Sequence, residues 1–235
     1  MFRTAFTLLA TLATLSATAA PIGIRLDGFA YGYAAVDTSA QSGYIGAGEF
    51  SGQLTSNGQT VSFLTYCTDI YQGFSFGTSY AHELVATGSA HGFTTRQEDL
   101  LGKLYTLAGR DVDTTNESAA FQLAVWEIVT ETSSSLSVLS GSFYLDRGAS
   151  TAQRTLADDW LAAASSNAAV KSFTAQRLYS ATAQDFVVFT ASPPALTLTL
   201  NVPGQVPEPA SYALVGLALA GLALGVRSEK RPPKA

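Results

Sequence analysis

Residues Gly43 to Ile70 read GYIGAGEFSGQLTSNGQTVSFLTYCTDI and contain the signal of a β-hairpin. Its centre, Ser56-Asn57-Gly58, is a turn signal, because Asn and Gly accept the positive φ angles that tight hairpin turns need. The flanking segments Gly43–Leu54 and Gln59–Ile70 are therefore predicted to pair as antiparallel strands. In the second strand, alternation separates two faces, one with Val61, Phe63, Thr65 and Cys67 and the other with Leu64, Tyr66 and Ile70.

Three helices are expected further along the chain. The first begins at a capping box, Thr95–Glu98, and the third begins at a second one, Ser150–Gln153. Asn116 is expected to cap the second helix, which has Glu117 in its first turn and runs to about Val129. The apolar residues expected to face the core are Leu100, Leu104 and Leu107 in the first helix and Leu156, Trp160 and Ala163 in the third.

Further strands are predicted on both sides of the helices. His82–Ala86 is a short candidate, and Asp185–Thr190 is rich in β-branched and aromatic residues. Residues 196–202 alternate apolar and polar side chains, as a half-buried strand does. Strands, then helices, then strands predict an α+β fold with a mostly antiparallel β core and a helical insert of about three helices.

The composition of the 235 residues excludes several classes of protein. Charged residues are 13% and hydrophobic residues 47%, which excludes a disordered chain. Because 13 basic residues face 18 acidic ones, nothing favours nucleic-acid binding. One Cys and two His allow no internal disulfide and argue against a Cys/His zinc site, and the sequence indicates no cofactor.

The first 20 residues resemble a secretory signal peptide. Arg3 precedes an apolar stretch, Ala5–Leu15, and Ala17-Thr18-Ala19 supplies the small residues of a cleavage site. A retained membrane anchor is the alternative interpretation. Cleavage after Ala19 or Ala20 leaves one predicted domain, residues 21–202.

The other end is predicted to have three parts. A linker, residues 203–210, contains Val206, Pro207, Glu208 and Pro209; an apolar run, residues 211–226, is expected to be a short transmembrane helix; and residues 227–235 form a basic, cytoplasmic tail. This order resembles the PEP-CTERM sorting signal of Gram-negative bacteria. The resemblance implies an inner-membrane anchor before processing by an exosortase, then delivery to the cell surface or an exopolysaccharide matrix.

Two residues of the predicted domain could carry chemistry. Cys67 is the chain's one cysteine, although a small buried hydrophobic residue on a strand is the ordinary explanation for it. Gln122 is the one uncharged polar side chain in the apolar run Ala119–Trp126. A buried amide without partners costs roughly 1–3 kcal/mol, so Gln122 either bonds a neighbouring loop or has another role.

Together these residues resemble the thioester domains of bacterial surface adhesins. In that family a Cys after an aromatic residue on a strand bonds to a Gln in a helix with the pattern Gln-x-Ala-Φ-Trp. Tyr66-Cys67 matches the first element and residues 122–126 match the second, whereas Phe121 stands where the family often has Thr. The resemblance implies a Cys67–Gln122 thioester that captures an amine or a hydroxyl of a surface or matrix component, without turnover as an enzyme.

The residues that flank the pair have expected roles. Ala124 belongs to the motif, and Trp126, one turn after Gln122, could shield the thioester from water. Formation and capture both need a proton acceptor. Asp69 is a candidate because it is expected to share the strand face of Cys67, and the further candidates are Glu127, Tyr66, His82 and His91.

Three alternatives remain from the sequence. A calcium loop is suggested by residues 111–116, but Asn116 and Gln122 occupy the positions at which such loops have Gly and Glu. A hydrolase that pairs Cys67 with His82 or His91 lacks a flanking nucleophile signature. A non-covalent structural or carbohydrate-binding matrix protein, with an inert Cys67, is the second interpretation.

Overall fold

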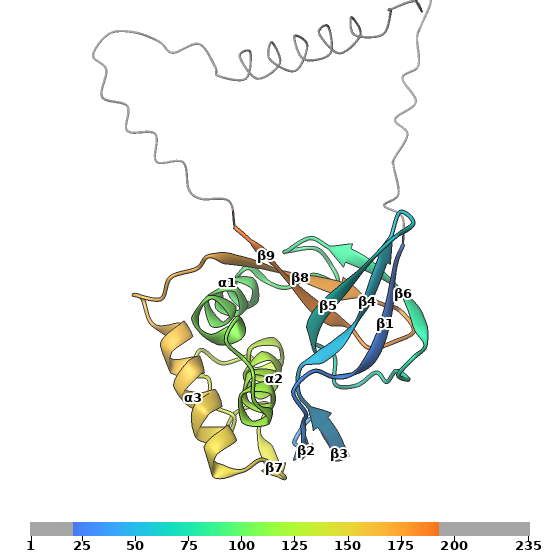
Figure 1. Cartoon of the computed structure of the whole chain (residues 1–235). Helices are drawn as coiled ribbons and strands as arrows, with labels where there is room; N and C mark the ends of the chain where they lie inside the picture. Colours follow the sequence, from blue (N-terminus) through green and yellow to red (C-terminus); the bar gives the residue numbers. More distant parts are fainter. Residues whose placement is uncertain (1–20, 193–235) are drawn as a thin grey trace, which may run out of the picture. The chain divides into compact units, whose positions relative to one another are not determined.

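The computed structural model describes residues 21–192 (Figure 1). Six strands close into an antiparallel barrel in the order β1-β4-β5-β9-β8-β6. Their bounds are β1 Ile22–Phe29, β4 Phe50–Ser56, β5 Gln59–Cys67, β6 Ser79–Val85, β8 Phe173–Tyr179 and β9 Phe186–Ala191. A smaller sheet, β3-β2-β7, consists of β2 Ala34–Thr38, β3 Gln41–Ala47 and β7 Leu145–Arg147.

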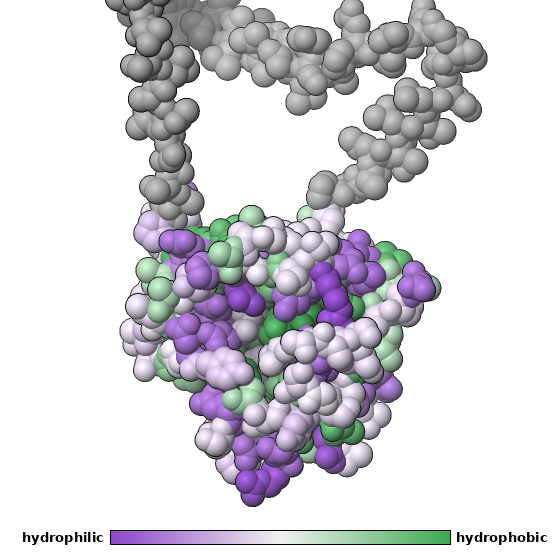
Figure 2. Space-filling model, turned by 180° about the vertical axis from the view of Figure 1, so that it is seen from behind, coloured by the Kyte–Doolittle hydropathy of each residue, from purple (hydrophilic) through white to green (hydrophobic). Residues whose placement is uncertain are grey.

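The helices form a layer on one side of the barrel (Figure 1). They are α1 Thr95–Leu104, which continues as the π-helical turn η1 Tyr105–Gly109, α2 Thr115–Thr130 and α3 Thr151–Ser165. All three follow β6 and precede β8, so the predicted α+β class with a mostly antiparallel core and a helical insert is confirmed for the described residues. Seen from behind the view of Figure 1, hydrophobic residues gather in small groups between hydrophilic ones (Figure 2).

The predicted hairpin is present between β4 and β5. Ser56 pairs with Gln59, and Asn57 and Gly58 both have positive φ angles, 50° and 75°. These are the angles of a two-residue hairpin turn with a twist that matches the strands.

The segment Gly43–Leu54 is two strands, where the sequence pattern predicted one. The chain leaves β3 at Ala47 and enters the barrel with β4 at Phe50. Gly48 lies between them, and a Cβ atom there would lie 2.6 Å from the carbonyl oxygen of Gly32. Only glycine allows such a close approach of two backbones, so the crossing from one sheet to the other is made at this position.

The helix starts differ from the predicted ones by one or two residues. Thr94, not Thr95, caps α1, and Thr114, not Asn116, caps α2 by accepting the N–H of Glu117. Asn116 lies inside α2, where its Oδ1 accepts a hydrogen bond from Gln153. The capping box that begins at Ser150 is confirmed.

Two predicted apolar stripes are shifted. In α1 the π-helical turn adds a residue, so Leu107 is exposed and Ala108 is buried instead. In α3 the buried apolar residues are Ala157, Leu161 and Ala164, which leaves Leu156 and Trp160 half-buried and Ala163 exposed.

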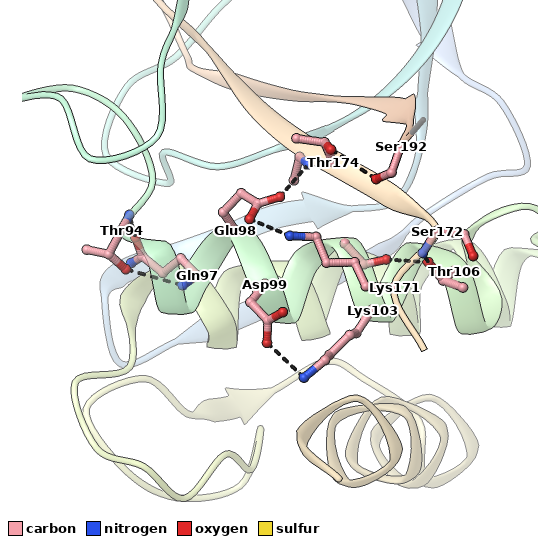
Figure 3. A network of polar contacts seen from close by, with 12 residues as sticks. Thr94, Gln97, Glu98, Asp99, Lys103, Thr106, Lys171, Ser172, Thr174 and Ser192 are labelled. Atoms are coloured by element: carbon pink, nitrogen blue, oxygen red, sulfur yellow. Dashed lines mark hydrogen bonds and ion pairs between the residues drawn. The ribbon is translucent and has the colours of Figure 1, made fainter. Parts of the chain in front are cut away.

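Polar contacts fix α1 against β8 (Figure 3). Glu98, which is buried, pairs with Lys171 and also accepts the backbone N–H of Ala175 at 3.4 Å. In η1, two residues after the end of α1, the Thr106 hydroxyl accepts the backbone N–H of Ser172 at 2.8 Å. The ion pair and the hydrogen bonds therefore hold both ends of α1 beside the segment that leads into β8.

Several predictions fall on residues that the structure does not describe. These are the signal peptide at residues 1–20, the strand at 196–202, the linker at 203–210, the transmembrane helix at 211–226 and the tail at 227–235. Among residues 21–192, none of the helices has the length and apolar character that crossing a membrane requires.

Candidate functional site

Cys67 is the last residue of β5 and is almost completely buried, with 1% of its surface exposed. Its backbone pairs with Phe186 of β9 on one edge of the strand. On the other edge, β4 ends its pairing with β5 at Thr65. The N–H and C=O groups of Cys67 on that edge therefore need another partner.

Gln122 of α2 supplies that partner. Its side-chain Oε1 accepts the backbone N–H of Cys67 at 2.9 Å, and its Nε2 donates to the Cys67 carbonyl oxygen at 2.9 Å. The amide of Gln122 thus takes the place of a neighbouring strand at the end of β5. The fold brings Cys67 and Gln122 into direct contact, although 55 residues separate them in the chain.

The Cys67 side chain is enclosed by Trp126 and by the backbone that follows β5. The thiol donates a hydrogen bond to the Asp69 carbonyl oxygen, with the sulfur and oxygen 3.3 Å apart. Burial raises the pKa of the Cys67 thiol to about 12, although the nearby Trp126 N–H and the backbone at Asp69 lower it. The Trp126 indole nitrogen has no hydrogen-bonding oxygen or nitrogen partner among the described residues. As a free thiol, Cys67 therefore keeps its proton at neutral pH.

Asp69 lies beyond the end of β5, so it does not share a strand face with Cys67, contrary to the prediction. Its side-chain Oδ1 accepts the backbone N–H of Tyr71 at 2.9 Å. Its backbone carbonyl, in contrast, receives both the Cys67 thiol and the side-chain amide of Gln184. The group of Asp69 that is hydrogen-bonded to the sulfur is this carbonyl oxygen.

Tyr66 contacts a different part of the core. Its ring packs against Phe121, with the ring centroids 4.5 Å apart. Its hydroxyl faces the buried carboxyl of Glu49, but neither the hydroxyl nor Glu49 Oε2 has a hydrogen bond of good geometry. Burial raises the pKa of Glu49 to about 7, while the nearby Tyr66 hydroxyl lowers it. No sequence pattern indicated Glu49, because its burial depends on the crossing between the two sheets.

Glu127 is hydrogen-bonded to the loop that follows α2. Its Oε1 accepts the backbone N–H of Ser137 at 2.9 Å, and its Oε2 has no partner among the described residues. Burial raises the pKa of Glu127 to about 8. Ala124 is fully buried in the same helix, where a small side chain fits the core.

Neither histidine is hydrogen-bonded to Cys67. His82 is buried, and its two ring nitrogens lie 3.2 Å from the Tyr80 carbonyl oxygen and 3.0 Å from that of Gln184. His91 is exposed and its ring stacks on Tyr179 with 4.0 Å between the ring centroids. A Cys–His hydrolase needs a hydrogen bond between the cysteine sulfur and a histidine nitrogen, so this arrangement does not support the hydrolase alternative.

A pocket of about 520 Å³ opens beside Trp126. Three lining residues lie near Cys67. Trp126 is beside its sulfur, Gln184 donates to the Asp69 carbonyl oxygen that also accepts the thiol, and Ile70 follows Asp69 in the chain. Most of the remaining wall is aromatic and consists of Phe29, Tyr33, Tyr44, Phe50, Tyr71, Phe74 and Phe76. These residues come from β1, β3, β4 and the loops after β1 and β5, so no local motif in the sequence indicates the pocket.

The described residues offer no metal site by their own geometry. Between residues 21 and 192, no three His, Cys, Asp or Glu side chains cluster as metal ligands would. In the segment that resembled a calcium loop, Thr114 and Glu117 bond each other as a capping box. This capping accounts for the polar residues at the start of α2.

Comparison with known proteins identifies the C-terminal end of the chain. Residues 205–231 match the family model described as the PEP-CTERM protein-sorting motif. The chain carries this sorting signal. The match implies an exported protein that is transiently anchored in the membrane and processed by an exosortase. Comparisons with curated proteins and with solved structures gave no match.

Proposed function

We propose that this exported protein attaches covalently to a surface or matrix component through a thioester between Cys67 and Gln122. The observation that carries the proposal is the pair of hydrogen bonds between the Gln122 amide and the Cys67 backbone. They hold the Gln122 amide against the backbone of the residue that carries the chain's one thiol, in a buried site. The resemblance of Tyr66-Cys67 and residues 122–126 to thioester domains supports the same chemistry.

The contacts suggest how the thioester forms. The Cys67 sulfur attacks the side-chain carbonyl carbon of Gln122, and the thiol proton passes to the leaving nitrogen, which departs as ammonia. The backbone N–H of Cys67 already donates to Gln122 Oε1, where negative charge develops during the attack. The raised pKa of the buried Cys67 thiol makes this step slow unless a proton acceptor assists it. Before the reaction, the thiol proton is hydrogen-bonded to the Asp69 carbonyl oxygen.

In the capture step the Cys67 sulfur is the leaving group, whereas it is the nucleophile when the thioester forms. An amine or hydroxyl of the partner attacks the carbonyl carbon, its proton passes to the sulfur, and Cys67 is released as a thiol. The partner remains joined to residue 122 by an amide or ester bond. Each molecule reacts once, so the protein is a covalent attachment device that needs no cofactor and does not turn over as an enzyme.

The sorting signal bears on where in the cell the proposed reaction occurs. We propose that an N-terminal signal peptide directs export and that cleavage by the exosortase releases the domain at the cell surface or into the extracellular matrix. This destination supports a function in adhesion or in assembly of a biofilm matrix.

A non-covalent role for the same domain is the second candidate. The two hydrogen bonds satisfy the Gln122 amide, as a purely structural core residue requires. In that case Cys67 stays a free thiol, and attachment to any partner reverses in denaturant.

Methylamine distinguishes the two candidates. With a thioester, methylamine adds to the side chain of residue 122 and releases one titratable thiol in denaturant. The Cys67→Ala variant is the matched control and must show no methylamine addition. A wild-type protein that takes up no methylamine and retains an unmodified Gln122 in its peptide map contradicts the proposal, whereas Glu at position 122 indicates a thioester that has hydrolysed.

A further inference from the structure

The pocket beside Trp126 has a surface that a monomeric domain normally buries. Three tyrosines and one phenylalanine on its wall are 47–68% exposed, namely Tyr33, Tyr44, Tyr71 and Phe76. Large exposed aromatic groups that gather around a hollow mark a binding site more often than an ordinary surface. Its volume of about 520 Å³ is within the range of small-ligand sites.

The polar groups of the pocket are all neutral. Among the described residues that line it, none is charged, and the polar side chains besides the tyrosines are the amides of Gln41, Gln72 and Gln184. Amides and phenolic hydroxyls both donate and accept hydrogen bonds. A charged ligand would find no counter-ion here, so the lining favours a neutral ligand that is rich in hydrogen-bonding groups.

The aromatic walls add a second requirement. Phe29 is stacked between Tyr33 and Phe50, whereas Tyr33, Tyr44, Tyr71 and Phe76 are 47–68% exposed and therefore offer ring surface to a ligand. A flat ring face packs well against a ligand surface made of C–H groups. A sugar ring combines such C–H faces with hydroxyl groups at its edge, and it therefore meets both requirements of this pocket.

We infer that the pocket binds a neutral saccharide. One consequence rests on the proposed function: the saccharide supplies the hydroxyl that the thioester captures. Trp126 connects the two sites, because it lines the pocket and its indole N–H lies beside the Cys67 sulfur. A sugar bound against Trp126 places its hydroxyl groups next to the side chain that covers the Cys67–Gln122 pair.

The alternative nucleophile is a lysine amine. An aromatic pocket also attracts a lysine ammonium through its ring faces. That attraction favours the protonated form, which is not nucleophilic, and among the described lining residues there is no carboxylate to pair with its charge. The neutral lining therefore favours binding of a neutral sugar over binding of a charged lysine side chain.

Binding can be measured without the covalent reaction. We would titrate the purified, exported Cys67→Ala variant with neutral oligosaccharides of glucose, galactose, mannose and N-acetylglucosamine, and with a lysine-rich peptide. Calorimetry should detect at least one of the neutral saccharides and no comparable binding of the peptide. Tyr71→Ala and Phe76→Ala should each weaken that binding by about tenfold, as expected from loss of one aromatic contact. Tyr144→Ala, which removes an exposed tyrosine outside the pocket, should leave it unchanged.

The outcomes separate this inference from the thioester. Saccharide binding by the Cys67→Ala variant supports the pocket even if wild-type protein takes up no methylamine. Preference for the lysine peptide, or no binding of any of these saccharides at ~10 mM, overturns the inference whatever methylamine shows. With binding established, an ester between the saccharide and residue 122 of wild-type protein tests the consequence that depends on the thioester.

Discussion

At the scale of single residues, the account depends on the surroundings of one sulfur atom. Cys67 is buried, protonated and covered by Trp126, so an unreacted thiol here would be inert toward most reagents. The same burial would protect a thioester from water until a partner arrives. Under the proposed function, the thioester is therefore a bond that is stored until capture.

Replacement of Trp126 tests that protection. In Trp126→Phe the N–H beside the sulfur is lost, and the wall between the pocket and Cys67 becomes thinner. We expect the thioester to hydrolyse roughly three- to tenfold faster, as the loss of one hydrogen bond would allow. The rate is measured by mass spectrometry as conversion of residue 122 to Glu. Trp160→Phe is the matched control on α3, and an equal acceleration in that variant would contradict the role of Trp126.

Glu49 predicts a dependence of stability on pH. Burial raises the pKa of Glu49 from 4.5 to about 7, so the folded protein keeps this proton at pH values where the unfolded chain has released it. Unfolding then releases a proton, and the free energy of unfolding falls as pH rises from 4.5 to about 7. Glu49→Gln should remove this contribution. Between pH 4.5 and pH 8, its free energy of unfolding should therefore fall by roughly 1–3 kcal/mol less than that of the wild-type protein.

Urea unfolding at several pH values measures this effect. Glu83→Gln, at an exposed position on β6, is the control for a change of charge alone. An unchanged pH slope in Glu49→Gln would show that the Glu49 carboxyl does not keep its proton in the folded protein.

At the scale of the elements, α2 is the part that positions the site. Its residues from Ser118 to Ile128 are buried, so both of its sides pack against other elements. Gln122 can complete the β5 edge only because β4 begins at Phe50 and leaves that edge free. The end of one strand and the middle of one helix together define the site.

The cap of α2 gives a prediction at this scale. Thr114 accepts the N–H of Glu117, so Thr114→Ala should lower the free energy of unfolding by about 1 kcal/mol. Asn116→Ala, at the position that the sequence pattern indicated as the cap, should cost clearly less. Urea denaturation of both variants decides between the two positions, and a larger loss for Asn116→Ala would contradict the observed cap.

The elements also show how far sequence patterns reach. The Asn57-Gly58 turn and the Ser150 cap were predictable because their signals are local. The capping positions of α1 and α2 were misplaced because neighbouring Thr and Asn residues have similar capping preferences. The split between β3 and β4 escaped detection because it depends on the contact of Gly48 with the distant Gly32.

The candidate site likewise has parts with a local sequence signal and parts that depend on contacts between distant segments. The sequence pattern indicated Cys67 and Gln122 together, because each belongs to a short motif. It misplaced Asp69 and did not indicate the Glu49–Tyr66 contact or the aromatic pocket. Those features bring together segments that are separated by tens of residues, and only the fold determines their contacts.

At the scale of the whole molecule, the sorting motif predicts how the protein leaves the membrane. Glu208 is the acidic residue between two prolines in the motif region. Glu208→Ala should leave full-length protein in the membrane fraction, whereas Glu229→Ala, in the basic tail, should be released normally. Immunoblots of membrane and extracellular fractions measure the result. Normal release of Glu208→Ala would remove the exosortase interpretation of this residue.

The most direct test of the central claim is the intact mass of the freshly purified, exported protein. A Cys67–Gln122 thioester makes the protein one ammonia lighter than its processed sequence, and Cys67→Ala should have the full mass of its own sequence. The account predicts the lighter mass for wild type alone. A wild-type mass equal to that of the processed sequence, with Gln122 and a free Cys67 in its peptide map, would contradict it.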